Sequence, residues 1–328
     1  MIASVYHGEI PAFLAACAQT PPVQRLKDIG MNCGCEYTAL PRFCGLPPYS
    51  RYNHSIGVAL IVWHFTGDPA QATAGLLHDI ATPVFAHVID FLKGDSLRQE
   101  ATEAGTLECI LGAPALQTAL QQAGLATEEV CDYHRYPIAD NPSPRLSADR
   151  LEYTLGDSVD YSLCSLAEAK ALYHDLTVTP NEQGTAELAF RSAAAAERFA
   201  LLALQCGQVY ASPEDRYAMQ LLAELLKNAL HQGVLTEADL HTTEPQVIQK
   251  LIAHPRLSAQ WADYRALAAV RSAPAPEGDG AWRQIATKRR FIDPLSLECG
   301  RVSRFSQPFR EAKATFLSQS QKDWLCRG

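Results

Sequence analysis

The chain has 328 residues, of which 47% are hydrophobic and 20% charged, and its 28 basic and 36 acidic side chains give a formal net charge of −8. This composition argues against intrinsic disorder, which combines low hydrophobicity with high charge density. The acidic balance argues against a bulk nucleic-acid partner, because such proteins carry a basic excess or a basic stripe. A small anionic substrate held by a few local cations is compatible with it.

The sequence predicts a cytoplasmic protein without a membrane partner. No apolar run approaches the roughly 18 residues that span a bilayer, and the first residues lack the basic and apolar regions of a secretory signal. The 10 cysteines are scattered and form no regular framework. Cys33, Cys35 and Cys44 lack the paired spacing that is typical of zinc sites, so they are interpreted as buried thiols.

Apolar residues recur at spacings of three and four along most of the chain, which predicts an all-α fold. Helices are expected near 10–18, 53–65, 71–81, 84–93, 97–111, 114–124, 126–134, 146–156, 163–173, 193–206, 213–232, 236–240, 244–253 and 257–271. Short strands are expected near 184–191 and 289–297. The linker-like composition of 272–280 divides the chain into a helical body, 1–271, and a small C-terminal appendage, 272–328.

Two histidines and two aspartates in helical segments form the main chemical constellation: His54, His78, Asp79 and Asp149. Adjacent residues on a helix point about 100° apart, so His78 and Asp79 can reach one ion only near a helix end or across a cleft. Such a mixed set suits Mn, Fe, Co, Ni or Zn, whereas Mg prefers more oxygen ligands. Residue spacing alone leaves open the alternative that both histidines are ordinary core residues.

Four segments occur in order along the chain: HGEIPAFLAACAQTPPVQRLKDIG at 7–30, SRYNHSIGV at 50–58, LLHDIATPVFAHVIDF at 76–91 and ADRLEYTLGD at 148–157. Together they resemble the HD-domain phosphohydrolase superfamily, in its deoxynucleotide triphosphohydrolase (dGTPase-like) branch. The resemblance extends over roughly residues 5–250. It implies an all-α HD-domain bundle with its core at about 50–165, additional C-terminal helices and one divalent metal ion, whether Mn, Fe, Co, Ni, Zn or Mg. A homo-oligomer and an allosteric nucleotide site rest on the resemblance alone.

The resemblance also assigns roles to individual residues. It implies that the metal ligands are His54, His78, Asp79 and Asp149, that Arg51 and Arg150 contact phosphate, that His87 faces the phosphates, and that Tyr153 and Asp157 read the sugar. The two arginines suit this role because a guanidinium can bind two phosphate oxygens at once.

The sequence departs from the family pattern at four positions. Thr82 and Gln99 stand where the family has histidines, Met31 aligns with a sugar-contacting glutamine, and Gly156 replaces an arginine before Asp157. Threonine and glutamine cannot transfer a proton near neutral pH, so the usual proton donor is lost or replaced. The candidates for proton transfer are therefore His87, Glu100 and His134.

The preferred interpretation is a phosphohydrolase that cleaves a phosphate ester of a nucleotide with a metal-activated water. In the dGTPase-like branch the bond cut lies between the α-phosphate and the nucleoside. The alternative is a catalytically impaired nucleotide-binding sensor that keeps the metal site, and a purely structural scaffold is disfavoured by the intact ligand set. Lys288, Arg289 and Arg290 are expected on a solvated face, or beside a neighbour's phosphate in an oligomer.

Overall fold

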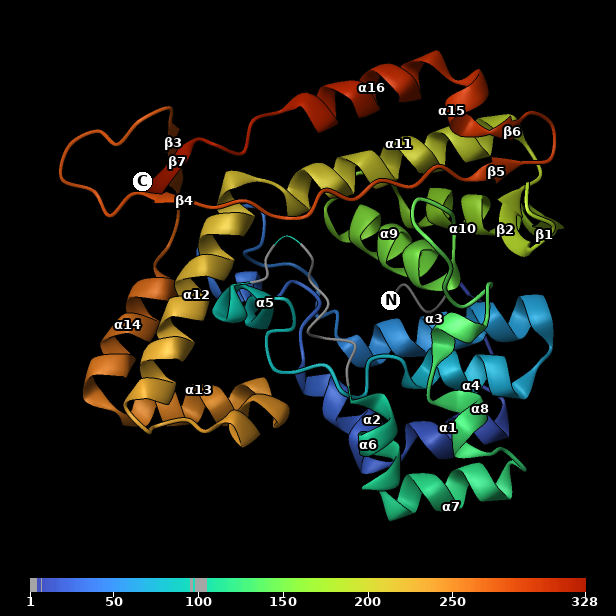
Figure 1. Ribbon diagram of the computed structural model, residues 1–328, viewed down its shortest axis with the longest axis horizontal. Coiled ribbons are helices and arrows are strands. Elements are labelled where there is room, and N and C mark those ends of the chain that lie inside the picture. Colours follow the sequence, from blue (N-terminus) through green and yellow to red (C-terminus); the bar gives the residue numbers. More distant parts are fainter. Residues whose placement is uncertain (1–4, 7, 95–96, 98–104) are drawn as a thin grey trace.

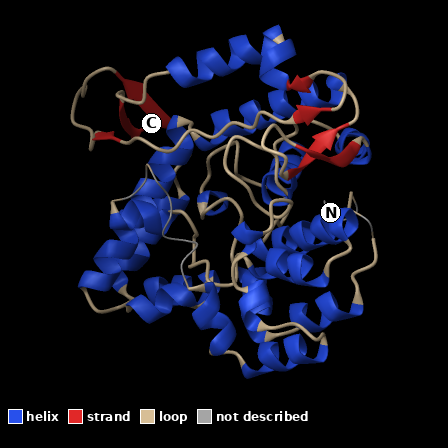
Figure 2. Cartoon of the chain, turned by 45° about the vertical axis from the view of Figure 1, so that its right-hand side comes forward, coloured by secondary structure: helices blue, strands red, loops and turns tan. Residues whose placement is uncertain are grey.

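The computed structural model describes residues 5–6, 8–94, 97 and 105–328. Helices form most of it, and short strands gather into two small sheets near the C-terminal part of the chain (Figures 1 and 2). The predicted all-α class with a small β element is confirmed. Among the described residues, no helix is both long enough and apolar enough to cross a membrane.

The helices divide between the two halves of the chain. The first half forms α1 (Ala12–Ala18), α2 (Pro21–Arg25), α3 (Arg51–Thr66), α4 (Pro69–Leu77), α5 (Val88–Lys93), α6 (Thr106–Leu111), α7 (Pro114–Gln122) and α8 (Thr127–Val130). The second half forms α9 (Ala148–Asp160), α10 (Leu166–His174), α11 (Ala193–Tyr210), α12 (Pro213–His231), α13 (Glu244–Ala253), α14 (Pro255–Arg265), α15 (Val302–Phe305) and α16 (Gln307–Ser318). Short 3-10 turns are η2 (Leu26–Asp28), η3 (Cys35–Tyr37), η4 (Tyr133–Arg135) and η5 (Glu237–His241).

Helix α3 lies at the centre of the bundle and packs against α4 and α9. Every residue from 54 to 62 is buried, so this helix is enclosed on all sides. A helix in this position needs apolar residues around its whole circumference, which the sequence SIGVALIV at 55–62 supplies. The buried start of α3 therefore brings His54 into the interior, where α9 also begins.

The later helices pack in two groups, one that begins with α9 and one around α12. Helix α9 packs on α11, which in turn packs on α16, while α12 packs on α5 and α14 (Figure 1). The four-stranded sheet has the order β1 (Leu176–Pro180), β2 (Ala186–Phe190), β5 (Leu295–Ser296) and β6 (Gly300–Arg301), and only the pair β2–β5 is parallel. The antiparallel three-stranded sheet has the order β3 (Val270–Ala273), β7 (Trp324–Arg327) and β4 (Arg283–Gln284).

Several elements differ from their predicted ranges, and three of these differences bear on the site or on the division of the chain. The helix predicted over 84–93 begins only at Val88, because Phe85 and Ala86 adopt the left-handed φ values of 57° and 44° in the preceding turn. The helix predicted over 257–271 ends at Arg265, and Val270 instead starts β3, which pairs with the distant β7. The boundary predicted at 271/272 therefore falls inside β3. The strand predicted over 289–297 is limited to Leu295–Ser296.

Candidate metal centre

Three helix ends position the predicted metal ligands. Ser50 caps α3 through a reciprocal hydrogen-bonded box with Asn53, which fixes the first turn that carries His54. Helix α4 ends at Leu77, so His78 and Asp79 lie in the turn that follows it. This is the helix-end placement that two adjacent ligands require. Ser147 caps α9, and Asp149 occupies the first turn of that helix.

The ligand atoms of His54, His78 and Asp149 converge on one point. The two histidine Nε2 atoms are 3.2 Å apart, and His54 Nε2 lies 3.0 Å from Asp149 Oδ1. All three ligand atoms lie within 4.8 Å of one another. Ligands that each stand about 2.1 Å from a transition-metal ion have such separations. This geometry fits a divalent metal site.

Asp79 lies beside this cluster but makes other contacts. Its Oδ2 is 3.6 Å from His78 Nε2 and accepts a hydrogen bond of 3.0 Å from Arg51 Nη1. Its Oδ1 accepts a hydrogen bond of 2.7 Å from Thr82 Oγ1. Burial alone would raise the pKa of Asp79, but Arg51 and the two histidines lower it well below its usual range. Asp79 is therefore an anion within reach of the cluster, already oriented by its neighbours.

Hydrogen bonds at the outer nitrogens orient both histidines towards the point of convergence. His78 Nδ1 donates to the Gly75 carbonyl at 2.7 Å, and His54 Nδ1 donates to Glu152 Oε2 at 2.5 Å. Both Nε2 atoms face the point of convergence, where a metal ion would take the place of a proton while Nδ1 keeps its hydrogen bond, as is usual for metal-binding histidines. Burial lowers the pKa of His54, but its hydrogen bonds to Asp149 and Glu152 raise it to about 10. The cluster therefore favours a positive charge at its centre, as a metal ion would supply.

Two glycines make room for the support of His54. A Cβ atom on Gly57 would lie 2.5 Å from Glu152 Oε1, and one on Gly156 would lie 2.6 Å from the Tyr49 hydroxyl. That hydroxyl donates to the same Glu152 oxygen that holds His54. The sequence departs from the family pattern at Gly156, and the absence of a side chain there leaves room for Tyr49.

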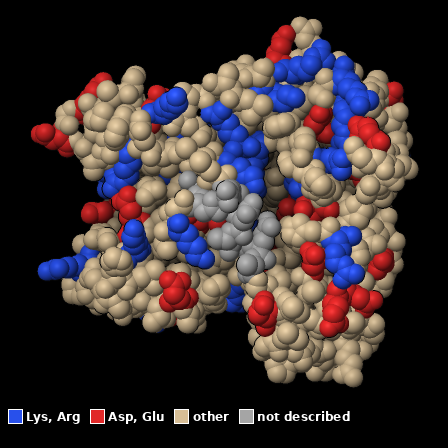
Figure 3. Space-filling view, viewed as in Figure 1, with Lys and Arg blue, Asp and Glu red and all other residues tan. Residues whose placement is uncertain are grey.

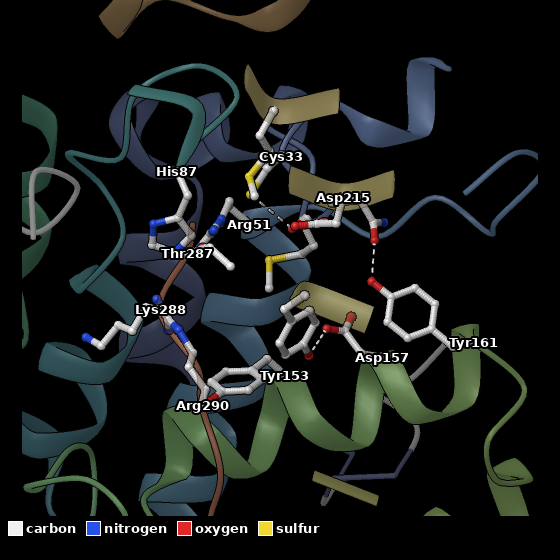
Figure 4. A pocket seen from close by; sticks show the side chains of 14 residues that line it. Cys33, Arg51, His87, Tyr153, Asp157, Tyr161, Asp215, Thr287, Lys288 and Arg290 are labelled. Carbon is white, nitrogen blue, oxygen red and sulfur yellow. Dashed lines mark hydrogen bonds between the residues drawn. The ribbon is translucent and has the colours of Figure 1, made fainter. Parts of the chain in front are cut away.

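The cluster opens into a cleft with two compartments. The outer one, a cavity of about 450 Å³, is lined by His78, Asp79 and Asp149 together with the loop at 140–143. The inner one, of about 120 Å³, reaches Asp157 and Asp215 (Figure 4). Five residues line both compartments: Arg51, His87, Tyr153, Lys288 and Arg290. On the molecular surface, basic side chains gather beside the central hollow and acidic ones lie across from them (Figure 3).

The structure brings most of the other predicted site residues to this cleft. Arg51, His87 and Tyr153 line both compartments, and Asp157 lines the inner one. His87 Nδ1 lies 2.9 Å from Asp90 Oδ2. Burial lowers the pKa of His87, and Asp90 only partly opposes this effect. Burial raises the pKa of Asp157 to about 7, although the Tyr210 hydroxyl donates to this carboxyl.

The remaining predicted residues lie at the rim or outside the described residues. His134, in η4, lines the outer compartment, and its Nδ1 is 3.0 Å from Asp132 Oδ1. Arg150 also lines it, but its guanidinium donates to Asp140, to both oxygens of Asn141 and to the Arg145 carbonyl. Glu100 and Gln99 lie outside the described residues.

Lys288 and Arg290 are cleft residues, although the sequence pattern favoured a solvated face for them. Both line the cleft of their own chain, because the extended segment between β4 and β5 runs along α11 (Figure 1). A Cβ on Gly207 of α11 would lie only 2.5 Å from the Arg290 carbonyl, so glycine permits this close approach. The run of basic residues at 288–290 was visible in the sequence, but its position in the cleft depends on this long-range contact with α11.

Comparisons with known proteins agree with this geometry. No protein-family model matches the chain. The uncharacterized protein YdhJ of Bacillus subtilis is 30% identical to it over 256 residues, which cover 77% of this chain and 75% of YdhJ. The chain belongs to the YdhJ family.

Two further proteins are similar to this chain, one in sequence and one in fold. The metal-dependent phosphohydrolase cns2 of Cordyceps militaris is 28% identical over 172 residues, covering 51% of this chain and about half of cns2 (47%). A crystal structure of a phosphohydrolase from Bacteroides thetaiotaomicron shares the fold, with a TM-score of 0.63, 17% identity and coverage of 97% and 96% of the two chains. Together with the His54, His78 and Asp149 cluster, these similarities support a metal-dependent phosphohydrolase.

Proposed function

We propose that this protein is a metal-dependent phosphohydrolase that cleaves a phosphate ester of a nucleotide in the two-compartment cleft. The observation that carries the proposal is the convergence of His54, His78 and Asp149 beside an arginine that faces the same cavity. The names of cns2 and of the Bacteroides thetaiotaomicron protein support the reaction class. The proposal that the substrate is a nucleotide rests on the resemblance to the dGTPase-like branch and on the placement of Tyr153 and Asp157 in the inner compartment.

His54, His78 and Asp149 would hold a divalent ion, with Asp79 beside them as the fourth predicted ligand. When bound, such an ion supplies Lewis-acid chemistry: it neutralises phosphoryl charge and lowers the pKa of bound water. Glu152 and the Gly75 carbonyl keep the histidine Nε2 atoms directed at the ion's position. The two histidines are thereby oriented before an ion binds.

Arg51 is suited to hold the phosphate. Its Nη1 donates to Asp79, which orients the guanidinium. Its Nε is buried and has no hydrogen-bond partner among the described residues. Leaving a buried donor unpaired costs free energy, so a ligand that accepts this bond is favoured. A phosphate oxygen is such an acceptor, and it would meet Arg51 where the two compartments join.

His87 is the proposed proton acceptor in the cleft. With its Nδ1 proton directed at Asp90, the imidazole leaves Nε2 as an acceptor. The lowered pKa of His87, caused first by burial, keeps the ring neutral near pH 7 and able to take a proton from water. His134 is the second candidate, at the rim of the outer compartment.

The test is hydrolysis of a nucleotide panel by the purified protein with Mn²⁺. We expect release of phosphate, or of triphosphate if the reaction follows the dGTPase-like branch, from at least one nucleotide. Asp79→Ala should abolish release, whereas Asp263→Ala, at an exposed position of α14, should not. Absence of turnover with every nucleotide and metal would refute the hydrolase.

The alternative sensor function is favoured by one observation, the hydrogen bond from Thr82 to Asp79 where the family has a proton-transferring histidine. Tight, metal-dependent nucleotide binding without turnover would establish this alternative. Failure to retain any metal would contradict both functions.

A further inference from the structure

The inner compartment has two walls of opposite character. Arg51, Lys288 and Arg290 form one wall, next to the phosphate position (Figure 4). Asp157 and Asp215 lie on the other side. A ligand that spans this compartment therefore directs negative charge towards the first wall and hydrogen-bonding groups towards the second.

The surfaces between these walls suit a planar ring. Two thioethers, from Met31 and Met219, line the compartment together with the rings of Tyr153, Tyr161 and Tyr210. Thioethers and aromatic rings make favourable contacts with the faces of other aromatic systems. A flat heterocycle can use these contacts, which a flexible aliphatic chain would use less well.

Asp215 is a buried carboxyl in this compartment with a weak protein partner. Its carboxyl lies in the first turn of α12 and the residue is only 8% exposed. In the described part of the chain its one side-chain hydrogen bond comes from the Cys35 thiol, with 3.8 Å between Sγ and Oδ1. A thiol is a weak donor.

The neighbouring phenols are committed to other acceptors. The Tyr210 hydroxyl donates to Asp157, and the Tyr161 hydroxyl donates to Asn32 at 2.8 Å. Burial raises the pKa of the Asp215 carboxyl well above its usual range, so this group costs folding free energy. An under-paired buried carboxyl in a cavity is a candidate for ligand recognition.

We infer that Asp215 determines specificity by accepting an N–H from the exocyclic amino group of an aromatic heterocycle bound in the inner compartment. The inference rests on the proposed function, because the phosphate of the same molecule would lie between Arg51 and the metal cluster. A positively charged aliphatic amine is disfavoured as the occupant, since the basic wall of Arg51, Lys288 and Arg290 would repel it.

The test compares nucleotides that differ only by the amino group. The probes are guanosine and inosine 5′-monophosphates, adenosine and purine-riboside 5′-monophosphates, and phosphoethanolamine as the amine without a ring. For any probe that is turned over, kcat/KM is measured with the Mn²⁺-loaded protein. For any probe that is not turned over, Kd is measured by calorimetry.

We expect the wild-type protein to prefer the amino-bearing member of at least one pair by about tenfold, the usual effect of a buried hydrogen bond. Asp215→Leu, which removes the acceptor at similar volume, should reduce this ratio to about one. Asp215→Asn, which retains an acceptor oxygen, should keep most of the ratio. A purely structural role would change stability and leave the ratio as it is.

Three outcomes would overturn the inference: equal affinity of the wild-type protein for both members of both pairs, an unchanged ratio in Asp215→Leu, or stronger binding of phosphoethanolamine than of every nucleotide. The first and third outcomes need no variant, so they hold even if Asp215→Leu does not fold. Failure of the proposed function is a separate result, because it is read from phosphate release and not from the amino-group ratio.

Discussion

The two ends of the cleft place the same side chain in opposite environments. At the metal end, Arg51 lies beside Asp79, Arg150 lies near Asp149 and the two histidines lie near both carboxyls. These neighbours lower both carboxyl pKa values despite burial. At the inner end, Asp157 and Asp215 are also buried, but burial prevails and raises their pKa values. Neighbouring charge, and not burial, therefore separates the two pairs.

This difference in pKa suits the two ends of the cleft to different parts of a ligand. Carboxylates that stay ionised can hold a cation, whereas carboxyls that are readily protonated exchange hydrogen bonds with a neutral group. The boundary runs through Arg51, His87 and Tyr153, which line both compartments. A phosphate ester has a matching division, with its charge at one end and a neutral organic group at the other.

The largest expected effect comes from comparing two Asp→Asn variants on the same helix, α9. Asp149→Asn removes an anionic ligand from the cluster, so we expect loss of bound metal and a decrease in kcat/KM of about 10³-fold or more. Asp157→Asn, two turns along α9, should leave the metal content unchanged and mainly raise KM. Metal analysis of both variants, together with steady-state kinetics, checks the pair.

Equal metal loss in the two variants would break the comparison, because it would mean that the inner carboxyl also supports the ion. Full metal content in Asp149→Asn would show that His54 and His78 do not share a site with this residue.

A smaller effect is expected at the support of the metal end. Glu152→Gln weakens the acceptor that holds the His54 Nδ1 proton, and such changes behind a ligand typically reduce metal affinity by about 10- to 100-fold. Tyr49→Phe removes only the hydroxyl that donates to Glu152, so its effect should be the smaller of the two. Competition with a chelator measures both affinities. Unchanged affinity in Glu152→Gln would remove this residue from the metal end.

The sequence predicted most helices before residue 271 and three residues that the structure brings together, because both predictions depend on local patterns. Helical spacing located α3, α4 and α9. The sequence pattern singled out His54, His78 and Asp149, and the structure brings these three residues together. Lys288 and Asp215 could not be assigned in this way. Their positions depend on a segment that packs along α11 and on the start of α12, and neither contact leaves a periodic signal.

Departures from the family pattern were also only partly interpretable from sequence. Thr82 and Gly156 were recognised as substitutions, but their contacts were not predictable. The structure shows Thr82 donating to Asp79 and Gly156 making room for Tyr49. The contact between Gly156 and Tyr49 depends on the packing of α3 against α9, whereas Thr82 and Asp79 are only three residues apart in the turn after α4.

A third buried carboxyl, outside the cleft, tests whether a raised pKa by itself marks ligand recognition. Glu36 lies beside Glu244, which accepts hydrogen bonds from Gly30 N at 3.0 Å, Phe85 N at 3.2 Å and the Tyr37 hydroxyl at 2.8 Å. Glu36 Oε2 has no partner among the described residues. Burial, and then the charge of Glu244, raise the pKa of Glu36 to about 8. Glu36 is therefore the member of the pair that holds a proton.

Glu36→Gln should change stability and leave the nucleotide ratio unaffected. The folded-state pKa of Glu36 exceeds its unfolded value, so its favourable contribution is complete below about pH 4.5 and is lost as pH rises through about 8. We expect Glu36→Gln to flatten this decline and to raise the free energy of unfolding at pH 8 on the order of 2 kcal/mol, with little change at pH 5. Urea unfolding at both pH values measures the effect, with the exposed Glu128→Gln as control. An equal decline in wild type and variant would show that Glu36 is not the group that holds the proton. An altered amino-group ratio would show that a buried carboxyl can affect ligand recognition without lining the inner compartment.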